Sequence, residues 1–517
     1  MRGLAALIGL AFCLATYFIL RYQGLWAEND TAVFHELIGA VQKARSIDPP
    51  NAYLHGYAYQ SVATTLVGLS GLDMTTFLQL YSPVLGTLML ALFGYVAYFR
   101  LLLSRVYALF ATSVLFLVPE VLFTVLRGNH EKFTLSLSLL AALLVLRLLA
   151  ALQARAERRQ VVAWFVALCV CLFTLDTLNL FFGSVFLSAL TITLLLLVVT
   201  TRRLHLPVHR RDLLLLTGVA VTGWLLVALT LAVVYPAARG DFSLFTSAIR
   251  HAGSLLTRKA SAVNPYAAID SDWSSPQLYQ LVTAFRFLLL GGAVLSMVLE
   301  LRDMGRQATV PLGRLLLVGL FAASLVQLAS SVVIDTLGLE SGSNLQVRIY
   351  PYVVLWASPL FALGLQRLSG SPLVRRAPVL WRGGLLALLA VLLVSSLLKS
   401  SLDPLLSNRW LGYRPGEVQA VQTWAAQAQR SSLWVGHDAR VSFGYVMEVG
   451  GTLPHNNTLS TSPTAKVQSA YALRSPLVDA NNRVWKVPLP SVLLGDQIYD
   501  NGEAQVVWRH PATQFQK

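Results

Sequence analysis

The sequence predicts an α-helical polytopic membrane protein with about eleven transmembrane helices. Its 517 residues are 55% hydrophobic and only 13% charged, about half the charged fraction of an average soluble domain. The mean hydropathy is +0.60, and many windows exceed the roughly 18 apolar residues that indicate a spanning helix. The predicted spans are 4–20, 77–99, 106–125, 133–152, 161–176, 180–200, 213–235, 281–301, 313–336, 348–366 and 384–399.

The net charge of +15 follows the predicted topology, so we expect membrane lipids and no nucleic acid as partners. Basic residues are concentrated in alternate connections, such as 155–159, 201–211 and 302–306. The positive-inside rule places these connections and the N-terminus in the cytoplasm. With an odd number of spans, the 21–76 loop and the C-terminus lie outside the cytoplasm. We expect the bacterial inner (plasma) membrane as the location.

The 21–76 loop contains an apolar second part that is too short for a span. Gly68, Gly71 and Asp73 interrupt residues 57–77, which favours a short re-entrant or surface-lying helix.

The last part of the chain differs from the rest in composition, because its charge is nearly balanced and it is rich in turn residues. PGEVQAVQTWAAQAQ at 415–429 has the start signal and apolar spacing of a helix. SSLWVGHD at 431–438 and EAQVVWRH at 503–510 read as short strands. We therefore predict a transmembrane domain at 1–399 and a small extracytoplasmic α/β domain at 400–517.

Acidic residues lie close to the predicted bilayer surface in WAENDTAVFHELIGAVQ, residues 26–42. Ionised carboxylates near lipid are costly and usually stay where they bind a cation or transfer a proton. Glu28 and Asp30 are therefore candidates for cation binding, or Asp30 for a general base. The alternative is a solvated helix start, in which Asn29 or Asp30 caps a helix that begins near Thr31.

A second polar cluster is the short connection RGNHEK at 127–132, on the same side of the membrane as Asp30. Arg127 and Lys132 could hold an anionic head group while Glu131 acts beside them. The alternative is that these are side chains at a helix end that extend their charged groups to the membrane interface.

A third signal is Arg348 in NLQVRIYPY, at the outer end of a predicted span. An arginine at the start of an apolar helix needs an anionic partner, and a lipid phosphate is a natural one. Snorkelling to the interface is again the alternative.

The order of these segments resembles the GT-C superfamily, integral membrane glycosyltransferases that use polyprenyl-phosphate-linked sugars. The resemblance is carried by WAENDTAVFHELIGAVQ, by NAYLHGYAYQ and VGLSGLDMTTF within 51–77, and by RGNHEKFTLSLSLLAALL at 127–144. QVRIYPY at 346–352 is similar to the arginine-bearing segment that some members use near the lipid phosphate. A small exported C-terminal domain is similar to oligosaccharyltransferase catalytic subunits and protein mannosyltransferase-like relatives.

This resemblance implies a glycosyltransferase that moves a hexosyl or pentosyl group from a polyprenyl-phosphate-linked donor to a lipid, glycan or protein acceptor on the exported face. The implied residues are Asp30 and Glu131 for catalysis, Arg348, Arg127 and Lys132 for the donor phosphate, and Glu28, His55, Tyr57, Tyr59 and His130 for substrate binding. Metal-using members often carry two acids where this chain has Asn129, His130 and Glu131. A divalent metal cofactor therefore stays open, with Asp30, Glu131 and His130 as the candidate ligands.

Two other functions stay open as well. A polysaccharide polymerase or ligase that uses a lipid carrier would rely on cationic residues of a long exported loop, and the 236–280 loop contains Arg250, His251, Arg258 and Lys259. A secondary transporter would place polar or broken spans near the bilayer midplane. Most predicted spans are uniformly apolar, and Glu120 after Pro119 is the main exception.

Overall fold

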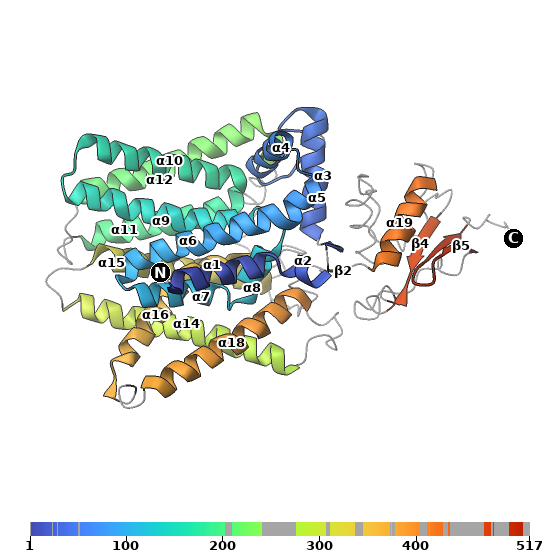
Figure 1. Ribbon diagram of the computed structural model, residues 1–517. Coiled ribbons are helices and arrows are strands. Elements are labelled where there is room, and N and C mark those ends of the chain that lie inside the picture. Colours follow the sequence, from blue (N-terminus) through green and yellow to red (C-terminus); the bar gives the residue numbers. More distant parts are fainter. Residues whose placement is uncertain are drawn as a thin grey trace.

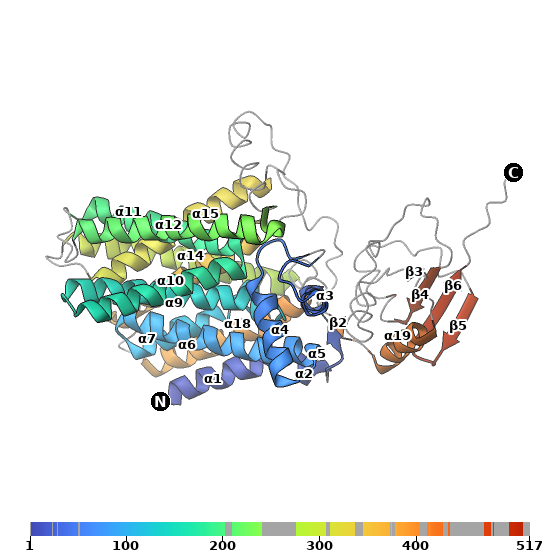
Figure 2. The ribbon, with the colours of Figure 1, turned by 90° about the horizontal axis from the view of Figure 1, so that it is seen from above.

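Long helices packed side by side form the main body of the protein, and a small sheet lies beyond one end of this bundle (Figures 1 and 2). The computed structural model describes residues 2–22, 24–27, 29–49, 52–201, 209–239, 276–306, 311–336, 345–372, 374, 378–402, 411–412, 414–427, 433–434, 470–476, 479 and 496–509.

The helices of the bundle are α1 (Arg2–Ala15), α6 (Ser82–Leu102), α7 (Arg105–Leu115), α8 (Pro119–Leu126), α9 (Glu131–Gln153), α10 (Arg158–Leu178), α11 (Leu180–Thr200), α12 (Arg210–Val234), α14 (Pro276–Met304), α15 (Leu312–Thr336), α16 (Leu345–Ser369) and α18 (Pro378–Leu402). Shorter helices are α2 (Tyr17–Tyr22), α3 (Asn29–Ala44), α4 (Ala58–Ser70) and α5 (Met74–Thr76), followed by a π-helix at Phe77–Tyr81 and a 3₁₀ turn at Pro236–Ala238. In Figure 1, α3, α4 and α5 lie at the end of the bundle nearest the sheet.

Every predicted span corresponds to one helix or to two consecutive helices. Within the described residues, nine helices are long and apolar enough to cross a membrane, and the bent pair α7–α8 makes a tenth if it counts as one span. The first predicted span, 4–20, is divided at Thr16 between α1 and α2. The prediction of a polytopic integral membrane protein is confirmed.

The predicted third span, 106–125, is a broken helix, because α7 and α8 meet at an angle of 76°. Pro119 lacks an N–H group and begins α8, as proline commonly does at the first helical position. At the break, the Leu117 carbonyl accepts a hydrogen bond from the Ser396 hydroxyl on α18. The bend directs α8 toward the Asp30 end of α3, where the cavity described below is found.

The centre of the bundle is formed around α16, which is buried along most of its length and contains Pro351 and Pro359. A proline leaves the carbonyl four residues earlier without an N–H partner, and an apolar interior supplies no water to replace it. For Pro359 that carbonyl belongs to Leu355, and it accepts a hydrogen bond from the buried Tyr98 hydroxyl at 2.6 Å. Pro359 is therefore compatible with a buried central helix.

The short helix α4 matches the predicted helix of the 21–76 loop. Its buried side carries Tyr59 and Ala63, whereas Val62, Leu66 and Leu69 form an exposed apolar row. One-sided apolar exposure is expected for a helix at the membrane surface.

The C-terminal sheet has the strand order β3-β4-β6-β5, with β3 parallel to β4 and the other neighbours antiparallel. Its strands are β3 (Leu433–Trp434), β4 (Ala470–Arg474), β5 (Asp496–Asp500) and β6 (Gln505–Arg509), and α19 (Pro415–Gln427) packs on β4 and β6. The predicted helix at 415–429 corresponds to α19 and the predicted strand at 503–510 to β6, whereas the two residues of β3 are the part of the predicted strand at 431–438 that the structure describes. The domain boundary at 400 and the exported location stay predictions.

A two-stranded ladder joins the start of the chain to its C-terminal part. Strand β1 (Trp26–Ala27) pairs antiparallel with β2 (Leu411–Gly412), just before α19 begins. The segment that leads into Asp30 is thereby hydrogen-bonded to the chain that leads into the C-terminal sheet.

Candidate functional site

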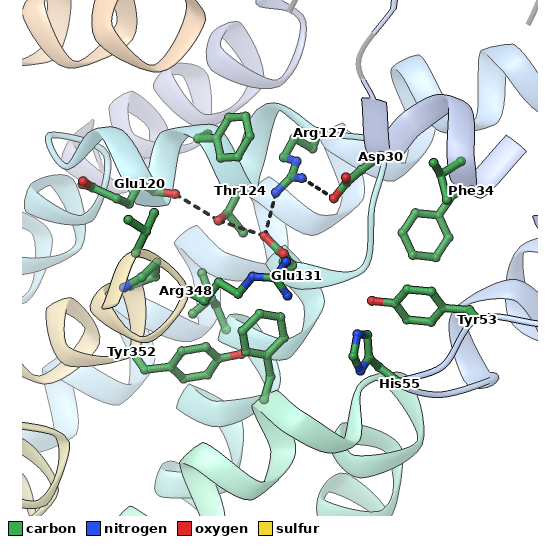
Figure 3. A pocket seen from close by; sticks show the side chains of 16 residues that line it. Asp30, Phe34, Tyr53, His55, Glu120, Thr124, Arg127, Glu131, Arg348 and Tyr352 are labelled. Carbon is green, nitrogen blue, oxygen red and sulfur yellow. Dashed lines mark hydrogen bonds and ion pairs between the residues drawn. The ribbon is translucent and has the colours of Figure 1, made fainter. Parts of the chain in front are cut away.

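A cavity of about 300 Å³ lies where the ends of α3, α8, α9 and α16 meet the loop at 52–57. Charged and aromatic side chains share its wall with a few apolar ones (Figure 3). The lining residues are Asp30, Val33, Phe34, Tyr53, His55, Glu120, Phe123, Thr124, Arg127, Glu131, Leu135, Phe182, Val347, Arg348, Pro351 and Tyr352. Asp30, the pair Arg127 and Glu131, and Arg348 lie far apart in the sequence and meet in the wall of one cavity.

Arg127 lies between the two predicted catalytic acids. One guanidinium nitrogen forms an ion pair with Asp30 Oδ2, and the other donates to Glu131 Oε2 at 3.1 Å. The Arg127 side chain is 7% exposed, whereas those of Asp30 and Glu131 are 27% and 18% exposed. The guanidinium also lies over the Phe123 ring, 4.1 Å from its centroid. The cation is thus buried behind two carboxylates that remain accessible from the cavity.

The turn that carries Arg127 is held by bonds from three sides. Tyr59 donates to the Gly128 carbonyl at 2.6 Å, and the Gly128 N–H donates to the Thr31 hydroxyl at 3.0 Å. A Cβ atom at Gly128 would lie 2.8 Å from the Leu78 carbonyl oxygen, so only glycine fits this approach. Because Thr31 follows Asp30, these bonds fix the two acid-bearing segments relative to each other.

Lys132 contacts this turn and does not line the cavity. Its ammonium group donates to the carbonyl oxygens of Arg127 and Asn129, the latter at 2.7 Å. The side chain is fully buried, and its stem passes over Gly86, where a Cβ would lie 2.3 Å from the Lys132 Cδ. The predicted phosphate contact of Lys132 is therefore corrected to a backbone contact that closes the turn.

Arg348 faces the cavity from the first turn of α16. Its side chain is exposed, and no ion pair to it is found among the described residues. Tyr352, one turn further along, is fixed by a 2.6 Å hydrogen bond between its hydroxyl and that of Thr134 on α9. Arg348 thus presents its guanidinium to the cavity without an ion-pair partner among the described residues.

Aromatic residues from the loop at 52–57 form another side of the cavity, with Tyr53 and His55 pointing into it (Figure 3). Their rings meet edge to face at 5.1 Å. The His55 carbonyl accepts a hydrogen bond from the Leu180 N–H at 2.7 Å, and the Tyr53 carbonyl accepts one from Tyr235 at 2.6 Å. Gly56 lies so close to α10 that a Cβ would be 2.3 Å from the Thr177 carbonyl oxygen. The predicted substrate-binding position of His55 is thus built on a tightly packed loop.

Other predicted substrate-binding residues lie away from the cavity wall. His130 is buried, and its Nε2 pairs with the Asn179 side-chain amide at 2.8 Å. Burial lowers the pKa of His130 well below its usual range, and nearby His55, Lys132, Arg127 and Arg348 act in the same direction. Tyr57 packs on Tyr235, and Tyr59 supports the turn as described. Direct substrate contacts of these three residues are not supported by the geometry. Glu28 and the residues at 240–275 lie outside the described residues.

The cavity also contains a feature that the sequence did not reveal. Glu120 on α8 forms an ion pair with Arg286 on α14, and the Arg286 guanidinium lies 5.5 Å from the Tyr350 ring centroid. Arg286 stands alone among apolar residues in LVTAFRFLLLGG, and a lone arginine in a span signals an anionic partner elsewhere in the fold. That signal predicts an anionic partner for Arg286, but the structure is needed to identify the partner as Glu120.

Comparisons with known proteins identify the fold. No protein-family model matches the chain, and no curated protein matches its sequence. The apo oligosaccharyltransferase of Archaeoglobus fulgidus aligns at a TM-score of 0.56 and 13% identity over 88% of this chain and 60% of its own. The same protein, AglB, aligns with an inhibitory peptide and a dolichol-phosphate bound (TM-score 0.53, 11%, 88% and 60%) and with Zn and sulfate bound (TM-score 0.53, 13%, 87% and 58%).

These matches confirm the fold that the sequence resemblance predicts. Over most of its length, the chain shares the fold of the Archaeoglobus fulgidus oligosaccharyltransferase structures. It spans about 60% of the length of the AglB structures that it matches.

Proposed function

We propose that this protein transfers a sugar from a polyprenyl-phosphate-linked donor to an acceptor in the cavity at the Asp30 end of the bundle. The observation that carries the proposal is the arrangement of charges. Two accessible carboxylates, those of Asp30 and Glu131, are ion-paired with Arg127, and Arg348 lies in the same cavity with no carboxylate partner among the described residues. AglB, which shares the fold, was solved with a dolichol-phosphate.

In the proposed reaction, Asp30 accepts the proton of an acceptor hydroxyl or amide as the acceptor atom bonds to the anomeric carbon. The bond from that carbon to the donor phosphate oxygen breaks, and polyprenyl phosphate leaves with one additional negative charge. A fixed cation at the leaving group lowers the barrier, because it meets charge that develops in the transition state. Arg348 is in position to supply it through two parallel hydrogen bonds.

Arg127 has a separate role in this scheme. It neutralises and orients Asp30 and Glu131, so both carboxylates keep one geometry at the cavity wall. Glu131 then supports Asp30 or contacts the sugar, and the aromatic side formed by Tyr53 and His55 provides an apolar surface with polar edges for the sugar or the acceptor.

The position of the cavity favours this function over transport. Asp30 is in the first turn of α3, Glu131 begins α9, Arg127 follows α8, and Arg348 is in the first turn of α16. All four residues lie at helix ends, whereas the transporter alternative expects its polar groups at mid-membrane.

Asp30→Asn is the sharpest test of the proposed chemistry. Asn caps a helix as well as Asp does, so the variant should keep the start of α3. It removes the proton acceptor, and release of polyprenyl phosphate from a panel of undecaprenyl-phosphate-linked sugars should fall by roughly a hundredfold or more. The wild-type protein should turn over at least one donor of the panel with a lipid, glycan or peptide acceptor. Equal turnover by a normally folded Asp30→Asn protein would contradict the assignment.

The proposal also requires the cavity to face the outside of the cytoplasm. We propose a cytoplasmic N-terminus, an extracytoplasmic C-terminus and the bacterial inner membrane, from the distribution of basic connections. Reporter fusions after residues 160, 211 and 306 should report the cytoplasm, and a fusion after residue 517 should report the outside. A cytoplasmic signal at 517 would overturn the orientation.

A further inference from the structure

The contacts of Asp30, Glu131 and His130 show whether these residues are suited to bind a divalent metal. Such an ion is bound by several acceptor atoms, chiefly carboxylate oxygens and neutral imidazole nitrogens, that converge on one point. One AglB structure contains Zn, and the sequence offers Asp30, Glu131 and His130 as candidate ligands. These residues could bind a metal only if their acceptor atoms were directed at one common, unoccupied point.

The two carboxylates face a cation that the chain itself supplies. Arg127 contacts Asp30 Oδ2 and Glu131 Oε2 through different nitrogens, and a guanidinium has five N–H donors but no acceptor. It therefore occupies the point on which both acids converge and adds no ligand for a metal. Its burial and its stacking on Phe123 hold it there.

The neighbouring groups also suit a guanidinium better than a metal. The Asn129 side chain presents its N–H to Asp30 Oδ2 at 3.1 Å, so it acts as a donor where a metal site needs an acceptor. His130 directs its Nε2 to Asn179, away from both acids. Among the residues that the structure describes, no three His, Cys, Asp or Glu side chains form a group that could hold a metal ion.

We infer that Arg127 takes the place of a divalent cation between Asp30 and Glu131, and that the site works without a metal. The first statement depends on the contacts of Arg127, and the second rests on the proposed function. A permanent guanidinium supplies the positive charge that keeps two carboxylates close together, and its charge persists at any physiological pH.

Removing the guanidinium leaves two carboxylates that Thr31, Tyr59 and Lys132 still hold near each other. Two such carboxylates with an open space between them supply anionic oxygen ligands, and water can complete the coordination of a divalent cation there. Arg127→Ala should therefore create an Mn²⁺ site that the wild-type protein lacks.

The experiment is an Mn²⁺ titration of the full-length protein in detergent, followed by electron paramagnetic resonance. Wild type should show no stoichiometric Mn²⁺ binding, and Arg127→Ala should bind one Mn²⁺ per protein molecule. Adding Asp30→Asn and Glu131→Gln to Arg127→Ala should abolish that binding. Arg127→Met keeps an apolar stem over Phe123 and replaces Arg127→Ala if the latter does not fold.

Two matched variants serve as controls. Arg127→Lys keeps the positive charge without the fork, so it should not gain the Mn²⁺ site. Arg367→Ala removes another arginine that contacts two carboxylates, Glu300 and Asp303, and it should leave Mn²⁺ binding near the cavity unchanged.

The outcomes separate this inference from the proposed function. Stoichiometric Mn²⁺ binding by wild type that Asp30→Asn abolishes would overturn the inference, as would loss of donor turnover in EDTA with recovery in Mn²⁺. Absence of a new site in a folded Arg127→Ala or Arg127→Met protein would also overturn it. If no donor is turned over while Arg127→Ala gains its Mn²⁺ site, the proposed function fails and the replacement of a cation by Arg127 stands.

Discussion

Two clusters of arginine and carboxylate side chains in this protein use the same residue types in opposite ways. In the cavity, buried Arg127 lies behind two accessible acids. In the second cluster, Glu300 on α14 is the buried member at 3% exposure, and Arg314 and Arg367 around it are 32% and 30% exposed. The first arrangement presents carboxylate oxygens to a ligand, and the second uses a carboxylate to join α14, α15 and α16. The identity of the buried member thus distinguishes the proposed reactive site from the structural cluster.

The largest expected effect concerns the structural cluster. Glu300→Ala removes the buried partner of Arg314 and Arg367, and each lost hydrogen bond to a charged group costs about 1.5–3 kcal/mol. We expect that loss in the free energy of unfolding, measured by denaturant titration in mixed micelles. Donor turnover per folded molecule should be unchanged.

Turnover that falls in Glu300→Ala in excess of the loss of folded protein would contradict the separation of the two clusters. Asp303→Ala is the milder companion variant, because Asp303 is half-exposed and pairs with Arg367 alone among the residues described.

The second effect concerns Arg348. Its hydrogen bonds to a phosphate are charge-assisted, and bonds of this kind contribute about 1.5–3 kcal/mol. Arg348→Ala should therefore weaken binding of undecaprenyl phosphate on the order of 10- to 100-fold, as measured by native mass spectrometry or thermophoresis. Arg348→Lys should retain only part of the affinity, because lysine lacks the fork.

Arg314→Ala is the control from the structural cluster, and it should bind the lipid as wild type does. Loss of binding in Arg314→Ala with full binding in Arg348→Ala would move the phosphate site to the opposite cluster.

The smallest expected effect is a pH dependence from His130. Burial lowers its pKa, so the folded protein keeps this imidazole neutral while the unfolded chain takes up a proton below about pH 6.5. Stability should be fully present above that pH and should fall as the pH drops below it, by at most about 1.4 kcal/mol per pH unit. Thermal unfolding of wild type and His130→Gln between pH 7.5 and about 5 measures this difference.

His130→Gln should show a shallower pH slope because it does not titrate. Burial also lowers the pKa of His35, so part of the slope should remain in the variant. Identical slopes in the two proteins would show that His130 is not the buried neutral group that the structure describes.

Much of the fold could be predicted from the sequence, because a helix that crosses a bilayer needs a long apolar segment, and such segments are recognised by their hydropathy. The bend between α7 and α8 was missed, although Pro119 marks its position. Hydropathy averages over the window and does not register the angle between two apolar segments.

The candidate site was predictable in part for a related reason. Asp30, Glu131 and Arg348 could be predicted as site residues because charged groups near lipid are costly and are usually retained for a function. The orientations of Lys132 and His130 were not predictable, since in a short turn the direction of a side chain depends on neighbours such as Gly86 and Asn179. The Glu120–Arg286 pair required two helices that are distant in sequence to be recognised as neighbours.

The most direct test of the central claim is an experimental structure of the protein with undecaprenyl phosphate bound. The proposed function predicts the phosphate in the cavity, within hydrogen-bond distance of the Arg348 guanidinium and on the same side as Asp30 and Glu131, with the prenyl chain leaving between helices. A phosphate bound instead at Arg314 and Arg367, with the Asp30 cavity lacking any lipid, would contradict it.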